Sequence, residues 1–242
     1  MDVARLARLL EDSQRAVVFT GAGVSTESGI PDFRSSQGLW RDIDPMKVAS
    51  IGALRKDPAT FYSFYRRRLG MLEGVRPNRA HEVIALLEER GYVRAVITQN
   101  VDGLHQRAGS RRVLELHGSL RKTVCLDCEG EFGGDLLGGE GVPECPRCGG
   151  VLKPGVVLFG EPLPGDVLEE AYELSRQADL HIVLGSSLVV SPANTLPQVT
   201  LANGGSLAIV NLEETPLDLY ADVLIRARVG ETMDALAREM GL

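Results

Sequence analysis

The chain contains no run of apolar residues near the roughly 20 residues that a membrane-spanning helix needs. It also lacks an excess of basic charge, because 26 Lys and Arg stand against 33 Asp and Glu, for a net charge of −7. This balance argues against general binding of DNA through a basic face. The first residues, 1–6, carry early charges and no apolar segment. We therefore expect no signal peptide, no membrane association, no direct contact with nucleic acid and a cytoplasmic location.

Cysteine is scarce, and the four cysteines all lie in one short region as two Cys-x-x-Cys pairs, Cys125/Cys128 and Cys145/Cys148. Each pair can direct two thiolates at one ion, and two pairs complete a tetrahedral zinc site. Four sulfur ligands leave no position for a substrate water, so the spacing predicts one structural zinc ion. The alternative, four free thiols, would leave a glycine-rich stretch with almost no core. A zinc ribbon that binds nucleic acid is disfavoured, since acidic residues between the pairs would repel phosphates.

What is present is an alternation of apolar strands and amphipathic helices, in a chain that is 44% apolar and 24% charged. This rhythm predicts an α/β fold with a doubly wound, Rossmann-like parallel sheet. We expect strands at 16–20, 93–98, 111–116, 156–159, 179–184, 206–210 and 221–225. We expect helices at 2–14, 61–69, 80–90, 164–177, after Pro192 and at 232–240.

The alternation of strands and helices is interrupted twice, which predicts one domain with a smaller inserted lobe. Residues 35–77 contain short helical pieces punctuated by prolines, and residues 121–153 carry the cysteines. These two segments form the predicted small lobe, part helical and part zinc-binding. The large Rossmann-like lobe then consists of 1–34, 78–120 and 154–242.

A glycine-rich turn, Gly21-Ala22-Gly23, follows the strand expected at 16–20. Such a turn lets backbone N–H groups approach a pyrophosphate, although Thr26 stands where the usual fingerprint has its third glycine. The turn continues into a polar stretch that ends at Arg34, which suggests chemistry on the bound ligand. Polar residues also follow three other expected strands, at 99–105, 185–187 and 211–213. The carboxyl ends of parallel strands are where α/β sheets bind ligands.

Seven motifs occur in the order in which sirtuins carry them. They are the 21–34 loop, Gln99-Asn100-Val101-Asp102, Leu116-His117-Gly118, the paired Cys-x-x-Cys, Phe159-Gly160-Glu161, Gly185-Ser186-Ser187 and Asn211-Leu212-Glu213. The chain thus resembles the sirtuin family, of the bacterial and archaeal type, over almost its whole length. This resemblance implies an NAD-dependent protein-lysine deacylase that transfers the acyl group to ADP-ribose and releases nicotinamide. The partners it implies are acyl-lysine proteins or peptides.

The resemblance also implies which residues hold NAD and which are catalytic. The cofactor-binding residues would be Gly21, Ala22, Gly23, Thr26, Asp32, Phe33, Arg34, Trp40, Gln99, Asn100, Val101, Asp102, Gly185, Ser186, Ser187, Asn211, Leu212, Glu213 and Val229. His117 would accept a proton from a ribose hydroxyl, a role that suits histidine near neutral pH. Asn100 and Asp102 would join it as catalytic residues. We interpret His81 as structural, His105 as fixing its loop, and His181 as a satisfied edge residue.

In sirtuins the peptide substrate adds as a strand between two edges of the protein, a main-chain mode of recognition. The resemblance places these edges at Val157, Phe159, Gly160 and Glu161 on one side and at Leu188 and Val189 on the other. Tyr65 and Arg68 match the Tyr-x-x-Arg of sirtuins that remove succinyl and malonyl groups. At i and i+3 they share one helix face, where they could pair with an acyl carboxylate.

Several alternatives remain open at this point. Thr26 stands where the acidic-acyl sirtuins carry alanine, and the pair Pro31-Asp32 is similar to deacetylases. Tyr65 and Arg68 could instead belong to an aromatic core face beneath solvated arginines. The same NAD site could also serve a mono-ADP-ribosyltransferase or a non-catalytic sensor of NAD or ADP-ribose. The sequence does not determine the oligomeric state.

Overall fold

The computed structural model describes residues 2–33, 35 and 38–242. Its centre is a six-stranded parallel sheet in the order β3-β2-β1-β7-β8-β9. The strands are β1 (Ala16–Thr20), β2 (Val93–Thr98), β3 (Val113–Glu115), β7 (Leu180–Leu184), β8 (Ser206–Val210) and β9 (Val223–Ile225). The predicted doubly wound α/β sheet is therefore confirmed.

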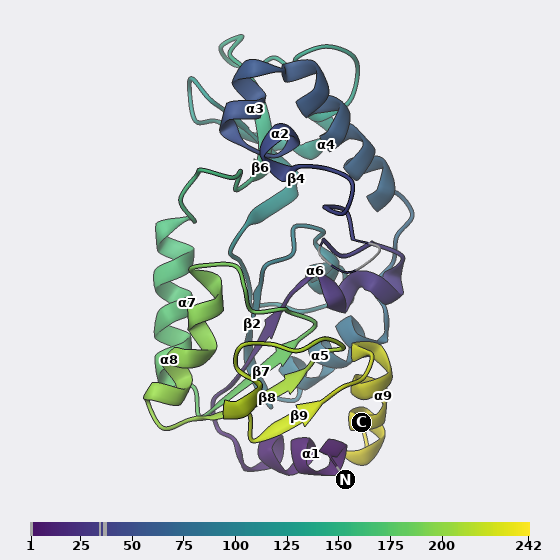
Figure 1. Cartoon of the computed structure of the whole chain (residues 1–242), viewed down its shortest axis with the longest axis vertical. Helices are drawn as coiled ribbons and strands as arrows, with labels where there is room; N and C mark the ends of the chain where they lie inside the picture. The colour runs from purple at the N-terminus through teal and green to yellow at the C-terminus, as the bar shows by residue number, and fades with distance from the viewer. Residues whose placement is uncertain (1, 34, 36–37) are drawn as a thin grey trace.

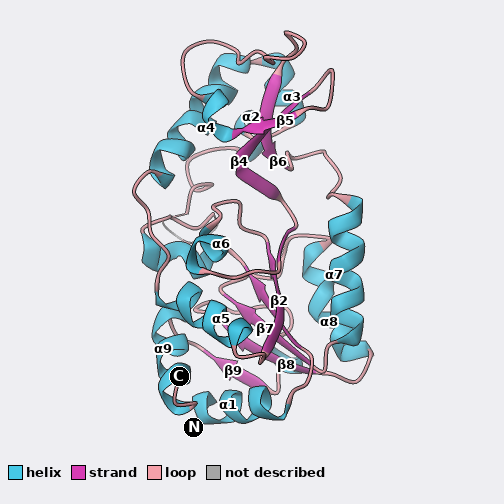
Figure 2. Ribbon diagram, turned by 180° about the vertical axis from the view of Figure 1, so that it is seen from behind, coloured by secondary structure: helices cyan, strands magenta, loops and turns pink. Residues whose placement is uncertain are grey.

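Helices cover both faces of this sheet, as Figures 1 and 2 show. One face carries α1 (Asp2–Asp12), α5 (Arg79–Glu89) and α9 (Val229–Glu239), and the other carries α7 (Gly165–Gln177) and α8 (Leu196–Ala202). Alternate residues of β1 serve the two layers, because successive strand side chains point to opposite faces. Val18 packs with α1, α5 and α9, whereas Phe19 packs with α7 and α8.

A second group of elements lies beyond one end of the sheet, at the top of Figure 1. It combines α2 (Pro45–Val48), α3 (Ile51–Lys56) and α4 (Pro58–Leu72) with a small antiparallel sheet in the order β5-β4-β6. Its strands are β4 (Gly118–Cys125), β5 (Glu131–Gly133) and β6 (Leu152–Val156). The predicted lobe boundaries, after 120 and before 154, fall inside β4 and β6.

Aromatic side chains of α4 form the core of this second group. Phe61, Tyr62, Phe64 and Tyr65 are all buried, and they pack against Leu120 and Leu158. The Tyr62 hydroxyl donates a hydrogen bond of 2.7 Å to the Leu152 carbonyl of β6. The helix and the small sheet thus share one core. None of the helices in the described part of the chain is long and apolar enough to span a membrane.

Two of the sequence expectations were wrong. The apolar run at 156–159 is not a strand of its own, since β6 ends at Val156. His181 is not an edge residue, because β7 lies between β1 and β8 and the side chain is fully buried. Its Nδ1 contacts the Thr200 hydroxyl at 2.9 Å, and its Nε2 has no hydrogen-bond partner among the residues that the structure describes.

Candidate active site and zinc centre

A cavity of about 430 Å³ opens at the carboxyl edge of the parallel sheet, between the sheet and the α2–α4 group. Its volume is in the range of small-molecule sites. The predicted site residues that line it are Gly21, Ala22, Gly23, Thr26, Asp32, Phe33, Trp40, Tyr65, Arg68, Gln99, Asn100, Val101, His117, Val157, Phe159, Gly160, Glu161, Gly185, Ser186, Ser187, Asn211, Leu212, Glu213 and Val229. Asp102, Leu188 and Val189 do not line it, and Arg34 lies outside the described residues.

The glycine turn after β1 is packed tightly against the turn after β7. The Gly23 N–H donates to the Gly185 carbonyl at 2.9 Å. A Cβ atom on Gly21 would lie 2.7 Å from the Gly185 oxygen, and one on Gly185 would lie 2.5 Å from the Val24 nitrogen. The glycines are therefore required by contact between two loops. The sequence analysis did not identify this second requirement, which adds to the predicted approach to a pyrophosphate.

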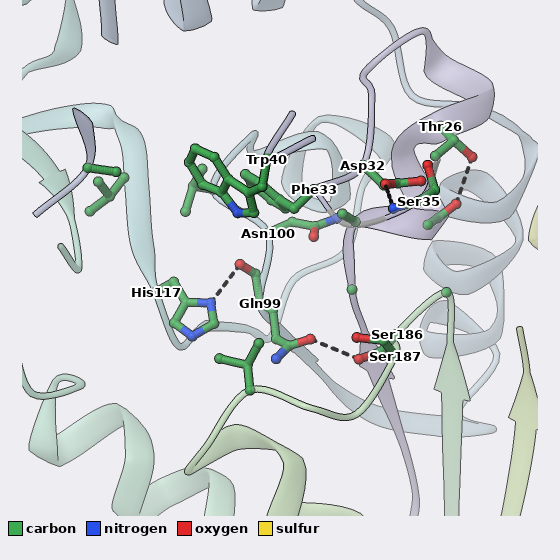
Figure 3. Close-up of a pocket in the computed structure, with 18 of the residues that line it drawn as sticks. Thr26, Asp32, Phe33, Ser35, Trp40, Gln99, Asn100, His117, Ser186 and Ser187 are labelled. Atoms are coloured by element: carbon green, nitrogen blue, oxygen red, sulfur yellow. Dashed lines mark hydrogen bonds between the residues drawn. The ribbon is translucent and has the colours of Figure 1, made fainter. Parts of the chain in front are cut away.

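His117 and Gln99 lie side by side in the cavity wall (Figure 3). The His117 Nδ1 lies 2.9 Å from the backbone carbonyl oxygen of Gln99. A carbonyl oxygen can only accept, so Nδ1 carries the proton and, in the neutral ring, Nε2 holds the lone pair. The Gln99 side chain is fixed as well, because its Oε1 accepts a 2.9 Å hydrogen bond from the Ser186 hydroxyl.

Behind the cavity wall, Ser25 connects Asn100 and Asp102, two residues of the Gln99-Asn100-Val101-Asp102 motif. Its hydroxyl donates to the Asp102 carboxylate at 2.8 Å and accepts from the Asn100 amide at 3.1 Å. The other Asp102 oxygen accepts the Leu104 N–H at 2.9 Å, at the start of α6 (Leu104–Ala108). Asp102 is thus turned toward Ser25 and α6. The sequence reasoning missed Ser25, although it lies within the glycine-rich loop.

Two histidines, His81 and His105, lie close to this group of hydrogen-bonded residues. His81 lies at the third position of α5, in a capping box with Asn78, and its Nε2 lies 3.5 Å from the Ser25 hydroxyl. His105 contacts the Thr20 hydroxyl at 2.9 Å, and its ring centroid lies 4.9 Å from that of His81. Burial lowers the pKa of His81 to about 4 and that of His105 to about 3. Both rings are therefore neutral at pH 7.

Aromatic rings line the opposite side of the cavity (Figure 3). Trp40 stacks on Phe33 and Phe64, with centroid distances of 5.3 and 5.8 Å, and meets Phe159 edge-on. The Arg68 guanidinium lies 5.1 Å from the Phe33 ring centroid. Burial lowers the pKa of Arg68, while Tyr65 and Asp102 act in the opposite direction. No described residue forms an ion pair or a hydrogen bond with this guanidinium, which faces the cavity.

Glu27 is a further cavity residue that the sequence reasoning missed. It belongs to η1 (Ala22–Ser28), a 3₁₀ turn, and its Oε2 accepts the Gly230 N–H at 2.6 Å. Gly230 is in the first turn of α9, whose N-cap residue Arg228 provides no side-chain cap. A carboxylate is favourable at a helix N-terminus. Glu27 therefore ties the glycine loop to α9, and no sequence motif marks a contact over this separation.

The four cysteines meet in the small sheet. Their sulfur atoms all lie within 4.8 Å of one another, and the cross-pair distances are 3.5 Å for Cys125–Cys148 and 3.8 Å for Cys128–Cys145. These distances exclude disulfides, which need about 2.05 Å. They match the edge of a tetrahedron around zinc, about 3.8 Å for Zn–S bonds of about 2.3 Å. The donor set thus fits one structural zinc ion.

The two cysteine turns are built alike. The Asp127 N–H donates to the Cys125 sulfur and the Arg147 N–H to the Cys145 sulfur, each at 3.4 Å. The residue after each second cysteine, Glu129 or Gly149, has a positive φ of 54° or 76°. Backbone N–H groups that point at sulfur stabilise the thiolate form, which is the form that binds metal.

Comparisons with known proteins agree with this geometry. The sequence model of the Sir2 family matches residues 21–192. The chain belongs to the Sir2 family. It is 49% identical to an NAD-dependent protein deacetylase of Sulfurisphaera tokodaii, with 96% of this chain and 93% of the relative covered.

Two solved Sir2 structures, each 43% identical to this chain, show the same fold. A Sir2 complex with a p53 peptide and NAD⁺ superposes with a TM-score of 0.90 and covers 100% of this chain and 99% of that chain. A Sir2 variant with a deacetylated p53 peptide and 3′-O-acetyl-ADP-ribose gives a TM-score of 0.94, with 100% of both chains covered. The predicted membership of the sirtuin family is therefore confirmed.

Proposed function

We propose that this sirtuin is an NAD-dependent protein-lysine deacylase. The observation that carries the proposal is the position of His117. Its proton is held on Nδ1 by the Gln99 carbonyl, and it lines the same cavity as the glycine loop and the three other polar strand ends. The names and ligands of the related proteins support this function.

The cavity offers two chemically different regions for NAD. The polar strand ends, from Gly21 to Thr26 and at Ser186, Asn211 and Glu213, would hold the phosphates and the adenosine half. The aromatic side with Phe33 and Trp40 would shelter the nicotinamide half beside Gln99 and Asn100. When bound, NAD supplies an electrophilic ribose carbon by release of nicotinamide. The remaining predicted cofactor residues are proposed here in the same roles, Arg34 among them.

In this assignment His117 acts as the general base. Its Nε2 lone pair accepts a proton from a hydroxyl of the bound ribose, while the Gln99 carbonyl holds the ring in the required tautomer. Asn100 lines the same cavity, and its amide is fixed by Ser25. We propose that Asp102 contributes by orienting Ser25, and hence Asn100, since the carboxylate does not line the cavity.

The peptide would bind between the 157–161 segment and residues 188–190, since the first segment and Val190 line the same cavity. Phe159 and Val189 are both large apolar side chains that are at least 40% exposed. The N–H groups of Val157 and Phe159 already donate within the chain, to the carbonyls of His117 and Ala49. We therefore propose that this segment contributes carbonyl groups and the backbone around Gly160 and Glu161 to pairing with the substrate. Leu188 and Val189 would form the other edge.

Incubation of the protein with NAD and an acetyl-lysine peptide, with products identified by mass, tests the proposal. We expect nicotinamide, free lysine peptide and O-acetyl-ADP-ribose. Removal of a general base typically lowers the rate by about 10²–10⁴-fold, and we expect this loss for His117→Ala. ADP-ribose attached to protein would instead indicate an ADP-ribosyltransferase. Binding of NAD without turnover would indicate a sensor.

Arg68 favours a second, finer proposal, that acidic acyl groups such as succinyl are also removed. Its guanidinium faces the cavity beside the buried Tyr65 and has no ionic partner among the described residues. A half-buried cation without an ionic partner is costly, and an acyl carboxylate would compensate its charge. We expect Arg68→Met to abolish desuccinylation while deacetylation is retained, and exposed Arg67→Met to change neither. Equal loss of both activities in Arg68→Met would contradict this assignment.

The two-lobe division stays a proposal as well, with 1–34, 78–120 and 154–242 in the large lobe. The cytoplasmic location is likewise proposed, on the support of the four reduced cysteines of the metal site.

A further inference from the structure

One ion pair differs from the others in its burial. The Lys153 ammonium lies 2.9 Å from the Glu161 carboxylate, and the two side chains are only 13% and 22% exposed. Within the described part of the chain, no other ion pair has both side chains less than a quarter exposed. Lys153 belongs to β6, whereas Glu161 lies in the connection that leads to α7.

The hydrogen bonds of this pair converge on one short segment. Glu161 Oε2 accepts the Leu158 N–H at 2.8 Å, and Lys153 Nζ donates to the Val156 carbonyl at 2.9 Å. The chain turns at Gly160, where φ is +92°. The two charged side chains thus fix both ends of the stretch 156–161. Every residue of this stretch lines the cavity.

Because the Lys153–Glu161 pair is largely buried, a contribution to stability alone does not explain it well. Removal of two charges from water offsets much of their mutual attraction, so buried pairs contribute little net stability compared with apolar residues. What such a pair does provide is a defined geometry. The same sheet contains a contrasting pair, Lys122–Glu131, at 2.8 Å, in which both side chains are more than half exposed. Lys122 and Glu131 bond to each other and do not line the cavity.

We propose that Lys153 and Glu161 are positioning residues that hold the 157–160 edge in the conformation that receives the acyl-lysine peptide. This inference rests on the proposed function. Lys153 does not line the cavity, so it acts through the backbone that it holds. Without the ammonium, the Glu161 carboxylate loses its counter-charge and the Val156 carbonyl loses a donor. The 157–160 edge is then free to shift.

The test compares Lys153→Met with Lys122→Met in steady-state kinetics on an acetyl-lysine peptide. For Lys153→Met we expect KM for the peptide to rise roughly tenfold, with kcat and the KM for NAD within about twofold, because binding of one substrate is affected. Lys153→Arg keeps the charge and is expected to recover most of the affinity. Lys122→Met is the matched control and is expected to behave like the unaltered protein.

An unchanged peptide KM in Lys153→Met would overturn the proposal. A parallel loss of peptide affinity, NAD affinity and kcat would also overturn it, since that pattern indicates general loosening. If Lys153→Met does not fold, as judged by circular dichroism, Glu161→Gln is assayed in its place. Fluorescence anisotropy of a labelled acetyl-lysine peptide, with ADP-ribose present, measures binding without turnover. If the unaltered protein binds this peptide but does not deacylate it, the proposed function fails while the positioning role is still measured.

Discussion

The parallel-sheet region and the cysteine region are stabilised in opposite ways. The parallel sheet has apolar layers on both faces, built from three helices on one side and two on the other. The cysteine region has a small cluster of Cys125, Cys145 and Leu152, with a few partly buried neighbours. Hydrophobic burial is the dominant stabilising effect for the first, whereas the second buries too little apolar surface to fold by this effect alone.

The polar groups inside the two regions differ as well. The parallel-sheet region buries three neutral histidines, His81, His105 and His181, in hydrogen-bonded or aromatic surroundings. The cysteine region gathers four sulfur ligands whose charge in the thiolate form requires a metal ion nearby. One region therefore depends on the protonation state of its imidazole rings and the other on bound metal, and each dependence can be removed separately.

Removal of zinc is the largest expected perturbation, and it should act on the cysteine region first. Structural zinc sites of this type contribute about 10 kcal/mol or more of apparent folding free energy at pH 7. We expect one zinc ion per chain, released by a thiol reagent and measured with a metal-sensitive dye. Cys145→Ser should release it and unfold the cysteine-bearing end of the small sheet, residues 125–149, as measured by hydrogen exchange.

The parallel sheet provides the internal control for this experiment. Amides of β1, β7 and β8 should stay protected after chelation, because their layers do not contain the metal ligands. Simultaneous loss of protection in both sheets would contradict the division of the molecule into two differently stabilised regions. Metal content above one ion per chain would contradict the four-cysteine assignment.

The parallel-sheet region is also the part that the sequence predicts well. The strands expected at 16–20 and 206–210 coincide with β1 and β8, because a fully buried parallel strand is a short, continuous apolar run. The position of His117 after a strand end was predictable from its motif, as were the paired cysteines. These are local patterns, and each one can be recognised from residues that are close together in the sequence.

The antiparallel sheet was not predicted, because its strands lack such a pattern. β4 contains Arg121 and Lys122 at exposed positions, and β6 contains Pro154 and Gly155, which are unusual in strands. The apolar run at 156–159 suggested a strand, yet its N–H groups bond to three different partners. Ser25 and Glu27 were missed because their contacts join loops distant in the sequence. Only the assembled fold brings those groups together.

Acid should weaken the parallel-sheet region through its buried histidines, which is the second largest expected effect. Burial lowers the pKa of His81 to about 4 and those of His105 and His181 to about 3, from 6.5 for a free side chain. The unfolded chain therefore binds more protons below pH 6.5. Stability should be complete above this pH and fall below it, by up to about 4 kcal/mol per pH unit for three histidines.

Urea unfolding between pH 7.5 and 5, followed by circular dichroism, measures this slope. His181→Leu removes one titrating ring, and its slope below pH 6 should be smaller by up to about 1.4 kcal/mol per pH unit. The unaltered protein at pH 7 and 7.5 serves as the reference, because these rings are expected to contribute almost equally to its free energy of unfolding at the two pH values. The same slope in His181→Leu would show that His181 does not contribute to the acid sensitivity.

The smallest expected effect concerns the Glu27 carboxylate, which joins the glycine loop to α9. Glu27→Ala removes the acceptor of the Gly230 N–H, and loss of a helix cap typically costs about 1 kcal/mol. Because Glu27 lines the cavity, the loop should also loosen, and affinity for ADP-ribose should fall by roughly three- to tenfold, about 1 kcal/mol in binding. Calorimetric titration with ADP-ribose and urea unfolding measure the two effects.

Glu231→Gln, in the same first turn of α9 and 69% exposed at its side chain, is the control. Equal behaviour of the two variants would mean that the contact between the loop and α9 does not shape the nucleotide end of the cavity, and that the apolar layers alone hold it.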